Sequence, residues 1–259
     1  MPSQTPALRD FGATYAKNLG FFEIPYRENC THFHLLGADQ ASSVYNHANP
    51  ALPMTVIGAP AYSPAYATLN SLKGFTTTEN VTPYSYSAII VSTSPYRMSD
   101  GVLDGGDIQA QLGATVSSYR WTSSSSDLFR CSPGAANGGD IITNTSINGG
   151  PANSRGHRHY KNLFQFVGFG EDAVMGRLVT EDGDRLQLWE GTFTSSPAKT
   201  AATMKLWGAG TGSTDITCEV AAFMIYNRLL SAAEFTAIHE QFLLPACEAR
   251  GVRRGAGLF

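Results

Sequence analysis

The sequence predicts an all-β fold, an antiparallel sandwich of two sheets that is followed by a short amphipathic helix. Only 15% of the 259 residues are charged, while the chain contains 26 glycines and 13 prolines, a composition typical of short strands joined by many turns. Near the C-terminus, a strand pattern that is apolar on both faces leads directly into a helical pattern. A chain of this length can form one sandwich of about 200–250 residues and needs no disulfides to do so.

Residues 1–74 are predicted to form an irregular N-terminal arm, because prolines interrupt the whole stretch. They stand at Pro2, Pro6, Pro25, Pro50, Pro53, Pro60 and Pro64. Aromatic residues such as Phe11, Phe22 and Tyr45 recur along the arm, whereas disordered linkers are poor in them. These side chains need a surface to pack on, either the sandwich or a neighbouring subunit. We therefore expect the arm to lock the chain into an assembly.

The sandwich is expected to begin at residue 75. An edge strand is predicted at residues 74–78 and a clearer one at residues 84–94, which read YSYSAIIVSTS. Loops rich in Gly, Ser and Asp follow, and short apolar segments between them predict further strands. These segments are residues 108–112, 118–121, 128–129 and 141–142.

Residues 161–190 are predicted to form a three-stranded meander. Its strands are expected at residues 162–169, 173–180 and 185–190. The turns between them are expected at residues 170–172 and at residues 181–184, where the sequence EDGD is a strong hairpin signal.

The last strand is predicted to lie in the middle of the layered structure, because both of its faces are apolar. Alternation places Val220, Ala222, Met224 and Tyr226 on one face, and Ala221, Phe223 and Ile225 on the other.

A helix is predicted directly after this strand. Ser231 and Glu234 have the spacing of a capping box, and Leu230 with Phe235 forms a hydrophobic staple around it. Phe235, Ile238 and Phe242 then recur at helical spacing, and Pro245 is expected to end the helix.

The C-terminal residues resemble a known family. Concanavalin A-like, laminin G-like jelly-roll domains end in a similar way, and the matching residues here are Tyr226, Asn227, Arg228, Leu230, Ser231 and Glu234. Residues 85–90 and 205–208 resemble further strands of the family, so the resemblance covers roughly residues 75–244. It implies a jelly-roll domain over residues 75–259, of the kind found in bacteriophage tail and surface proteins. Such domains bind glycans or proteins, cleave polysaccharides or build surfaces.

A ligand contact is predicted around residue 120. Glycan binding needs a shallow groove with an aromatic platform and polar neighbours, and an aromatic pair stands here beside the serine-rich loop 123–126. The predicted binding residues are Tyr119, Arg120, Trp121, Arg155, His157, His159 and Tyr160. By contrast, Trp189 and Trp207 lie in strand patterns and are expected to pack in the core.

No enzyme activity and no catalytic residue are predicted. The Glu-x-Asp-x-x-Glu strand of jelly-roll glucanases is absent, as are the Gly-x-Ser-x-Gly, His-Glu-x-x-His and Walker motifs. Acidic residues gather at Glu171, Asp172 and residues 181–184, where they are expected to solvate the tips of hairpins.

No cofactor is predicted, although two oxygen-rich loops could hold calcium. Their candidate ligands are Asp100, Asp104, Asp107 and Asp140. Two His-x-His pairs, His32/His34 and His157/His159, have a spacing that can chelate a transition metal from one side of a strand. Histidines packed in the core or at an interface are the favoured interpretation of these pairs.

Charge and hydropathy exclude several partners. A formal net charge of -3 argues against nucleic acid, and the one basic cluster (Arg250, Arg253, Arg254) is expected to be a solvated tail or an intersubunit contact. No window approaches the ~18 apolar residues of a membrane span. The N-terminus lacks the apolar run of a signal peptide, so we expect synthesis in a host cytoplasm. The four cysteines are expected to be free thiols, mostly buried.

These observations together predict a non-enzymatic virion protein of a tailed bacteriophage. Its jelly roll would bind a host glycan or protein from a tail fibre or tail tip, and its arm would contact other virion proteins. A homo-oligomer is expected, and phage fibres suggest a trimer by analogy. Two alternatives remain open: a capsid decoration or cement protein without a ligand, and a polysaccharide-acting enzyme on the same fold.

Overall fold

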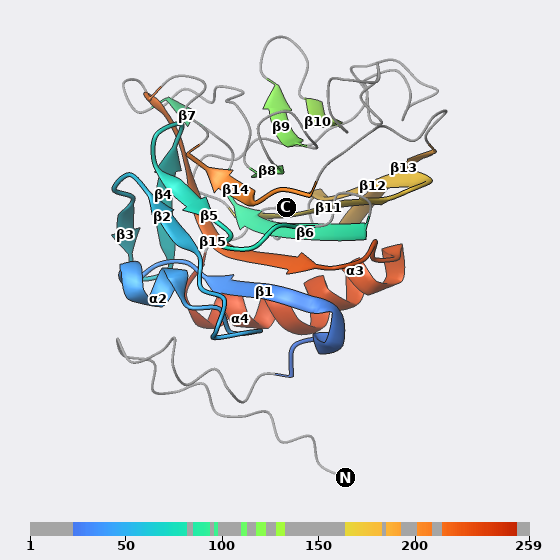
Figure 1. Cartoon of the computed structure of the whole chain (residues 1–259), viewed down its shortest axis with the longest axis horizontal. Coiled ribbons are helices and arrows are strands. Elements are labelled where there is room, and N and C mark those ends of the chain that lie inside the picture. The colour runs from blue at the N-terminus through green and yellow to red at the C-terminus, as the bar shows by residue number, and fades with distance from the viewer. Residues whose placement is uncertain are drawn as a thin grey trace.

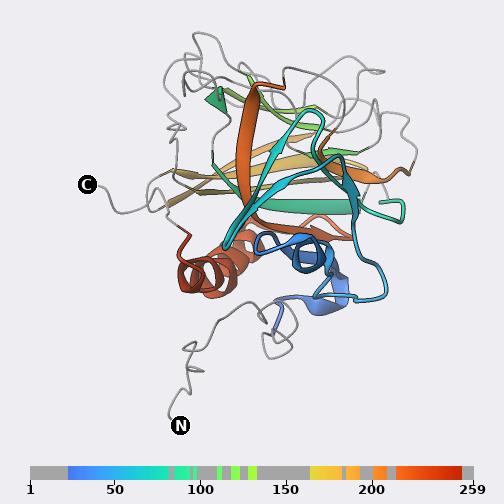
Figure 2. The ribbon, with the colours of Figure 1, turned by 90° about the vertical axis from the view of Figure 1, so that its left-hand side faces the viewer.

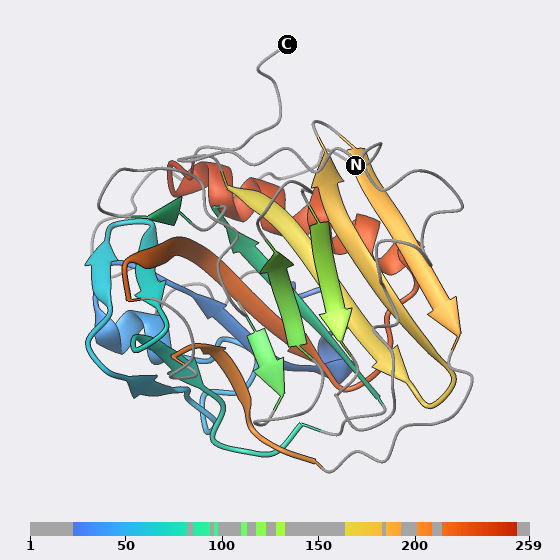
Figure 3. The ribbon, with the colours of Figure 1, turned by 90° about the horizontal axis from the view of Figure 1, so that it is seen from above.

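The computed structural model is a sandwich of two stacked antiparallel sheets, with helices on the outer face of the larger sheet (Figure 1). It describes residues 23–81, 85–93, 96–97, 110–112, 118–122, 128–132, 164–182, 185–192, 201–208 and 214–252. The all-β, two-sheet prediction with a short C-terminal helix is confirmed. Figure 2 shows the layers from the side, and Figure 3 shows the smaller sheet lying over the larger one.

The larger sheet has nine strands among the described residues, and the long strand β15 (Ile216–Tyr226) is its hub. Along the main path its order is β13 (Arg185–Thr192), β12 (Met175–Asp182), β11 (Gln165–Asp172), β6 (Ser85–Ser92), β15, β4 (Tyr66–Asn70) and β3 (Ala61–Ser63). Two further strands, β1 (Cys30–Leu35) and β7 (Tyr96–Arg97), also pair with β15.

The smaller sheet has six described strands. Their order is β10 (Leu128–Ser132), β9 (Ser118–Thr122), β8 (Ala110–Leu112), β14 (Met204–Trp207), β5 (Gly74–Thr76) and β2 (Thr55–Ile57). The predicted strands at 74–78, 108–112, 118–121 and 128–129 are therefore present, with shifted ends. The segment 141–142 lies outside the described residues.

Residues 30–74 differ from the predicted irregular arm, because they supply strands to both sheets. β1 and β4 pair with β15, and β2 pairs with β5. The intervening segment carries the short helix α2 (Gln40–Val44), which is capped by Asp39. The prolines lie between these short elements and do not prevent them. Of the predicted arm, residues 1–22 lie outside the described part of the chain.

The meander β11–β12–β13 is confirmed, but its first turn is displaced by three residues. The turn falls at residues 173–174, and the Asp172 carboxylate accepts hydrogen bonds from the backbone N–H groups of Val174 and Met175. Gly170 stays in β11 because the chain passes very close to β6 there: a Cβ at Gly170 would lie 2.4 Å from the carbonyl oxygen of Tyr86.

Strand β15 is apolar on both faces, as predicted, and a bulge changes which residues share a face. Phe223 and Ile225 belong to the core between the two sheets, whereas Met224 and Tyr226 belong to the core beneath the helices. The register shifts between Val220 and Ala222, so Val220 faces the other sheet and its predicted companions do not.

The C-terminal helix is longer than predicted. The capping box is present at α3 (Ala232–Ile238), which continues as a π-helical turn, η5 (His239–Leu243), and as α4 (Leu244–Ala249). Pro245 does not end the helix because it stands in the first turn of α4, where its missing N–H costs no hydrogen bond. None of the described helices is long and apolar enough to span a membrane.

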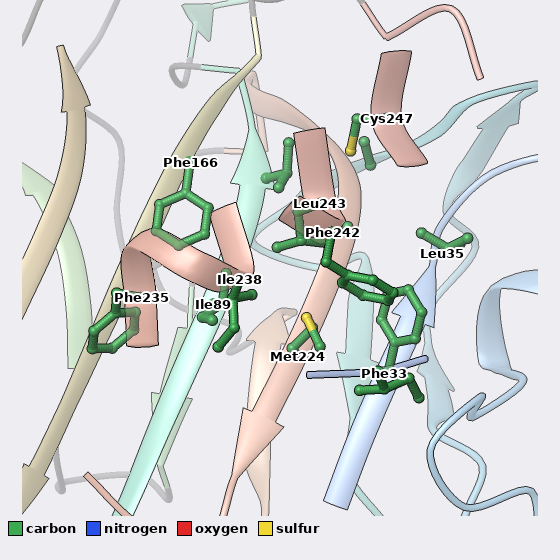
Figure 4. Close-up of a cluster of buried hydrophobic side chains, with 14 of the residues drawn as sticks. Phe33, Leu35, Ile89, Phe166, Met224, Phe235, Ile238, Phe242, Leu243 and Cys247 are labelled. Carbon is green, nitrogen blue, oxygen red and sulfur yellow. The ribbon is translucent and has the colours of Figure 1, made fainter. Parts of the chain in front are cut away.

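Two apolar cores hold the layers together. The first lies between the sheets and includes Phe75, Leu206 and Trp207, so the predicted core position of Trp207 is confirmed. The second lies between the larger sheet and the C-terminal helices (Figure 4). In it, Phe33 of β1 contacts Phe242 with ring centroids 5.1 Å apart. Fully burying such a side chain stabilises the fold by about 1.5–3 kcal/mol.

Candidate functional site

The register of the smaller sheet shows in which rows three of the predicted binding residues stand. Leu206 of β14 pairs with Phe75 of β5, and both are completely buried between the sheets. On its other side Leu206 pairs with Ala110, which in turn pairs with Tyr119 of β9. The register thus places Tyr119 in the row of Leu206 and Phe75, and Trp121 stands two residues further along β9.

The alternate rows of the same sheet are polar and lie on its outer face. Lys205 pairs with Thr76 on one side and with Gln111 on the other. Lys205 and Thr76 are half-buried and Thr55, which pairs with Thr76, is exposed. Gln111 pairs with Ser118, and two residues further along β9 stands Arg120. No helix of the described ranges covers this face, because the helices gather beneath the larger sheet (Figure 1).

Arg120 is the predicted binding residue that stands two positions along β9 from Ser118, in the register of Lys205 and Gln111. It pairs directly with Arg130 of β10. The remaining predicted binding residues, Arg155, His157, His159 and Tyr160, lie outside the described residues. Arg130 and Lys205 were missed, because their place beside Arg120 depends on strand order and is invisible in sequence.

Two carboxylates expected at hairpin tips are in fact buried in strands. Glu171 ends up in β11 with 1% exposure and Glu181 in β12 with 3%. The Glu181 carboxylate accepts a hydrogen bond of 2.9 Å from the Phe166 backbone N–H and lies 3.6 Å from Nε2 of His239. The imidazole packs edge-on against the Phe166 ring at 4.9 Å. Because this carboxylate–imidazole pair is sealed beneath the C-terminal helix, a polysaccharide cannot reach it.

The histidine pair of β1 has the predicted placement on one side of a strand. The rings of His32 and His34 stack with centroids 5.6 Å apart, and both side chains are buried. Within the described ranges, no three His, Cys, Asp or Glu side chains are grouped in a way that could hold a metal ion. The calcium candidates Asp100, Asp104, Asp107 and Asp140 lie outside those ranges.

The residues that carry the family resemblance have structural roles. The Tyr226 hydroxyl donates a hydrogen bond to the Pro25 carbonyl at 2.9 Å. The Arg228 guanidinium makes two hydrogen bonds with the Glu234 carboxylate and also stacks over the ring of Tyr26. Tyr226 and Arg228 therefore tie residues 25–26 and the start of α3 to the end of β15.

Three solved structures share this architecture at low sequence identity. The binding domain of Paraclostridial Mosquitocidal Protein 1 has a TM-score of 0.58 and 10% identity, over 83% of this chain and 53% of that chain. Domain 4 of AbnA, a GH43 extracellular arabinanase from Geobacillus stearothermophilus in complex with arabinotriose, has a TM-score of 0.51 and 12% identity, over 81% and 98%. A Trypanosoma rangeli sialidase mutant displaying trans-sialidase activity has a TM-score of 0.54 and 14% identity, over 82% of this chain and 32% of that chain.

These likenesses decide the fold. The protein is a jelly-roll β-sandwich. It spans about half the length of the mosquitocidal binding domain and a smaller share of the sialidase. No protein-family model and no curated sequence matches the chain. At such low identity the jelly-roll likeness extends to architecture and not to activity.

Proposed function

We propose that this jelly roll is a non-enzymatic binding module that recognises a glycan or a protein receptor through the outer face of its smaller sheet. The observation that carries the proposal is the row of paired polar residues Thr76, Lys205, Gln111 and Ser118, with Arg120 two positions further along β9, in a sheet whose outer face no described helix covers. The larger sheet has no equivalent, since the C-terminal helices pack on its outer face. Two structural neighbours, a toxin's binding domain and an arabinanase domain holding arabinotriose, support a binding role.

The proposed setting is the surface of a tailed bacteriophage, in a tail fibre or tail tip. Support comes from the C-terminal sequence resemblance and from the aromatic residues of the segment 1–22. In this setting the segment contacts other virion proteins, and the module forms a homo-oligomer, by analogy a trimer. Mass spectrometry of purified particles should detect the chain at a stoichiometry that is a multiple of three. Its absence from particles would remove the virion setting but leave the binding role intact.

The binding role is tested on a panel of immobilised glycans and host-surface extracts. The variant Arg120→Gln/Lys205→Gln should lose tenfold or more in affinity, because it removes two cations from the proposed contact face. Arg27→Gln is the matched control, since Arg27 is an exposed cation beside β1, beneath the larger sheet. Equal loss in both variants, or unchanged binding in the double variant, would refute the assignment of the face.

The same panel also tests the alternative that the protein is an enzyme. Two structural neighbours come from glycan-cleaving proteins, which is why this alternative is tested. Incubation with each bound glycan should leave its chain length unchanged under chromatography. Release of shorter products that a single Asp or Glu substitution abolishes would establish catalysis and overturn the non-enzymatic proposal. Binding to no glycan and no extract would instead favour the decoration or cement role.

A further inference from the structure

Three histidines gather around β1, in a part of the molecule that the binding proposal does not use. His32 and His34 stand on β1, and His47 follows helix α2; we call them the histidine cluster. His32 and His34 are 0% exposed. The His47 ring lies 5.3 Å from that of Phe33 and 4.9 Å from that of Tyr45.

His34 is the most enclosed member of the cluster. Its ring stacks between the ring of His32 and that of Phe223 on β15, the latter with centroids 6.5 Å apart. Backbone groups of Ser43 and Tyr45 approach the ring, yet neither ring nitrogen has a hydrogen bond of normal geometry with any described residue. A proton added here would therefore be a buried charge without a partner, which is strongly unfavourable.

The charged groups around the cluster offer little stabilisation to a protonated imidazole. Glu79, from the segment between β5 and β6, places Oε1 3.2 Å from Nε2 of His32, and Thr31 Oγ1 lies 3.1 Å from its Nδ1. From α4, the cation Arg250 acts on His47 and opposes its protonation. The Phe223 face on β15 is apolar. Glu79 is thus the one described carboxylate that faces the cluster, and it reaches only His32.

Burial accordingly lowers the pKa of all three imidazoles. The pKa of His32 and of His47 falls to about 4, and that of His34 lies well below its usual value. The unfolded segment binds protons below a pH of about 6.5, while the folded cluster does not until about pH 4. Stability is therefore complete above pH 6.5 and declines as the pH falls towards 4. At pH 5, opening that exposes one such histidine is favoured about 20-fold more than at pH 7.

Release of the segment that holds the cluster would leave the other strand pairs of the larger sheet in place. Among the described strands β1 pairs only with β15, while β15 keeps β6 on its other side. Asn46 binds the segment to itself: its side chain accepts from the Phe33 N–H and donates to the carbonyls of Thr31 and Leu52. Residues 30–54 thus form one internally connected unit that pairs with β15 and also contributes Leu36 and Met54 to the core between the sheets.

We propose that the histidine cluster is an acid-sensitive latch, which releases residues 30–54 from β15 below about pH 5 while the two sheets remain paired. Opening would uncover the apolar surface of Met224 and Phe242, against which β1 now packs. The latch would therefore expose a new apolar face of the module under acid conditions. This inference does not depend on the binding proposal.

Hydrogen exchange measured by mass spectrometry at pH 7.5 and pH 5.0 tests the latch on the full chain. After correction for the intrinsic exchange rate, peptides within 30–47 and 221–226 should exchange at least tenfold faster at pH 5.0. Peptides of β11 and β12 should keep their protection. Unchanged protection of residues 30–47 would overturn the proposal, and so would simultaneous loss of protection throughout the chain, because that is global unfolding.

Variants assign the effect to the cluster. His32→Gln/His47→Gln should abolish most of the acid response, since neither replacement titrates. His34→Phe, a substitution of similar shape that removes two buried nitrogens, should fold and should reduce the response. His239→Gln is the matched control: it removes a buried histidine of η5 that lies outside the cluster, and the acid response should persist. An undiminished response in both cluster variants would refute the role of these histidines.

Discussion

At the scale of single residues, Gly168 shows how closely the C-terminal helix approaches the larger sheet. A Cβ at this position of β11 would lie 2.4 Å from Cε1 of Phe235, whose ring is completely buried. Gly168→Ala should therefore lower the free energy of unfolding by about 1–3 kcal/mol, measured by urea denaturation. Phe235→Leu in the same chain should recover part of this loss. Additive effects in the double-mutant cycle would contradict the predicted clash.

Glu234 combines a cap and an ion pair. The Arg228 guanidinium, which donates to it, lowers its pKa to about 2. Glu234→Gln should lower the free energy of unfolding by about 0.5–1 kcal/mol at pH 7. Because the native carboxylate stays ionised further into acid than the unfolded one, this contribution is present above about pH 4.5 and is lost as the pH falls towards 2. Denaturation curves of both proteins should converge there, and a constant gap would contradict the ion pair.

Cys30, Cys218 and Cys247 are thiols protected by burial. Cys218 and Cys247 are 0% and 1% exposed, and burial raises the pKa of Cys30 to about 12. In a Cys131→Ser background, Ellman's reagent should find no rapidly reacting thiol in the native protein and three after unfolding. Fast reaction in the native state would mean that one of these sites opens readily. Reducing agent should leave the melting temperature of that variant unchanged.

At the scale of elements, the strands of residues 30–74 decide where the chain can be shortened. A version that starts at Lys73 lacks β1, β2, β3 and β4 and should fail to fold, judged by near-UV circular dichroism. A version that starts at Glu23 should fold, because both described cores are built from residues after that point. If the version that starts at Lys73 were a folded monomer, the predicted boundary between arm and jelly roll at residue 74 would be correct.

The C-terminal elements could be predicted from sequence because their signals are local. Ser231 and Glu234 are three residues apart, and the apolar residues of β15 are contiguous. The alternation within β15 was predicted wrongly at Val220, since a bulge depends on how neighbouring strands pair. Likewise Glu171 and Glu181 looked like turn residues, and only the extended length of β11 and β12 buries them.

The first strands were not predicted, because the sequence carries no clear local signal for them. β1 contains two histidines, which are usually half-exposed, and its partner β15 lies almost 200 residues away along the chain. The strands β2 and β3 have three residues each, too few for a visible period. At the candidate site, the local sequence suggested Tyr119 and Trp121 as the exposed pair. Strand order puts Tyr119 in the row of the buried residues Leu206 and Phe75, which the local sequence does not reveal.

At the scale of the whole molecule, the segment 1–22 can be tested as an assembly device. The full chain should form an oligomer of defined mass by light scattering, and the version that starts at Glu23 should be a monomer with an unchanged circular dichroism spectrum. If both versions were monomers, the segment would have no assembly role. If both were oligomers, the subunit contact would lie on the sandwich itself.

The position of β15 as hub of the larger sheet has a consequence for biosynthesis. On the ribosome, β1, β4 and β6 emerge long before the strand that lies between them. They must remain without their shared partner until about residue 226 has left the exit tunnel, and closing such long loops is slow. The nascent chain therefore carries unpaired strand edges for most of its synthesis. We expect chaperones to bind the chain mainly during this period.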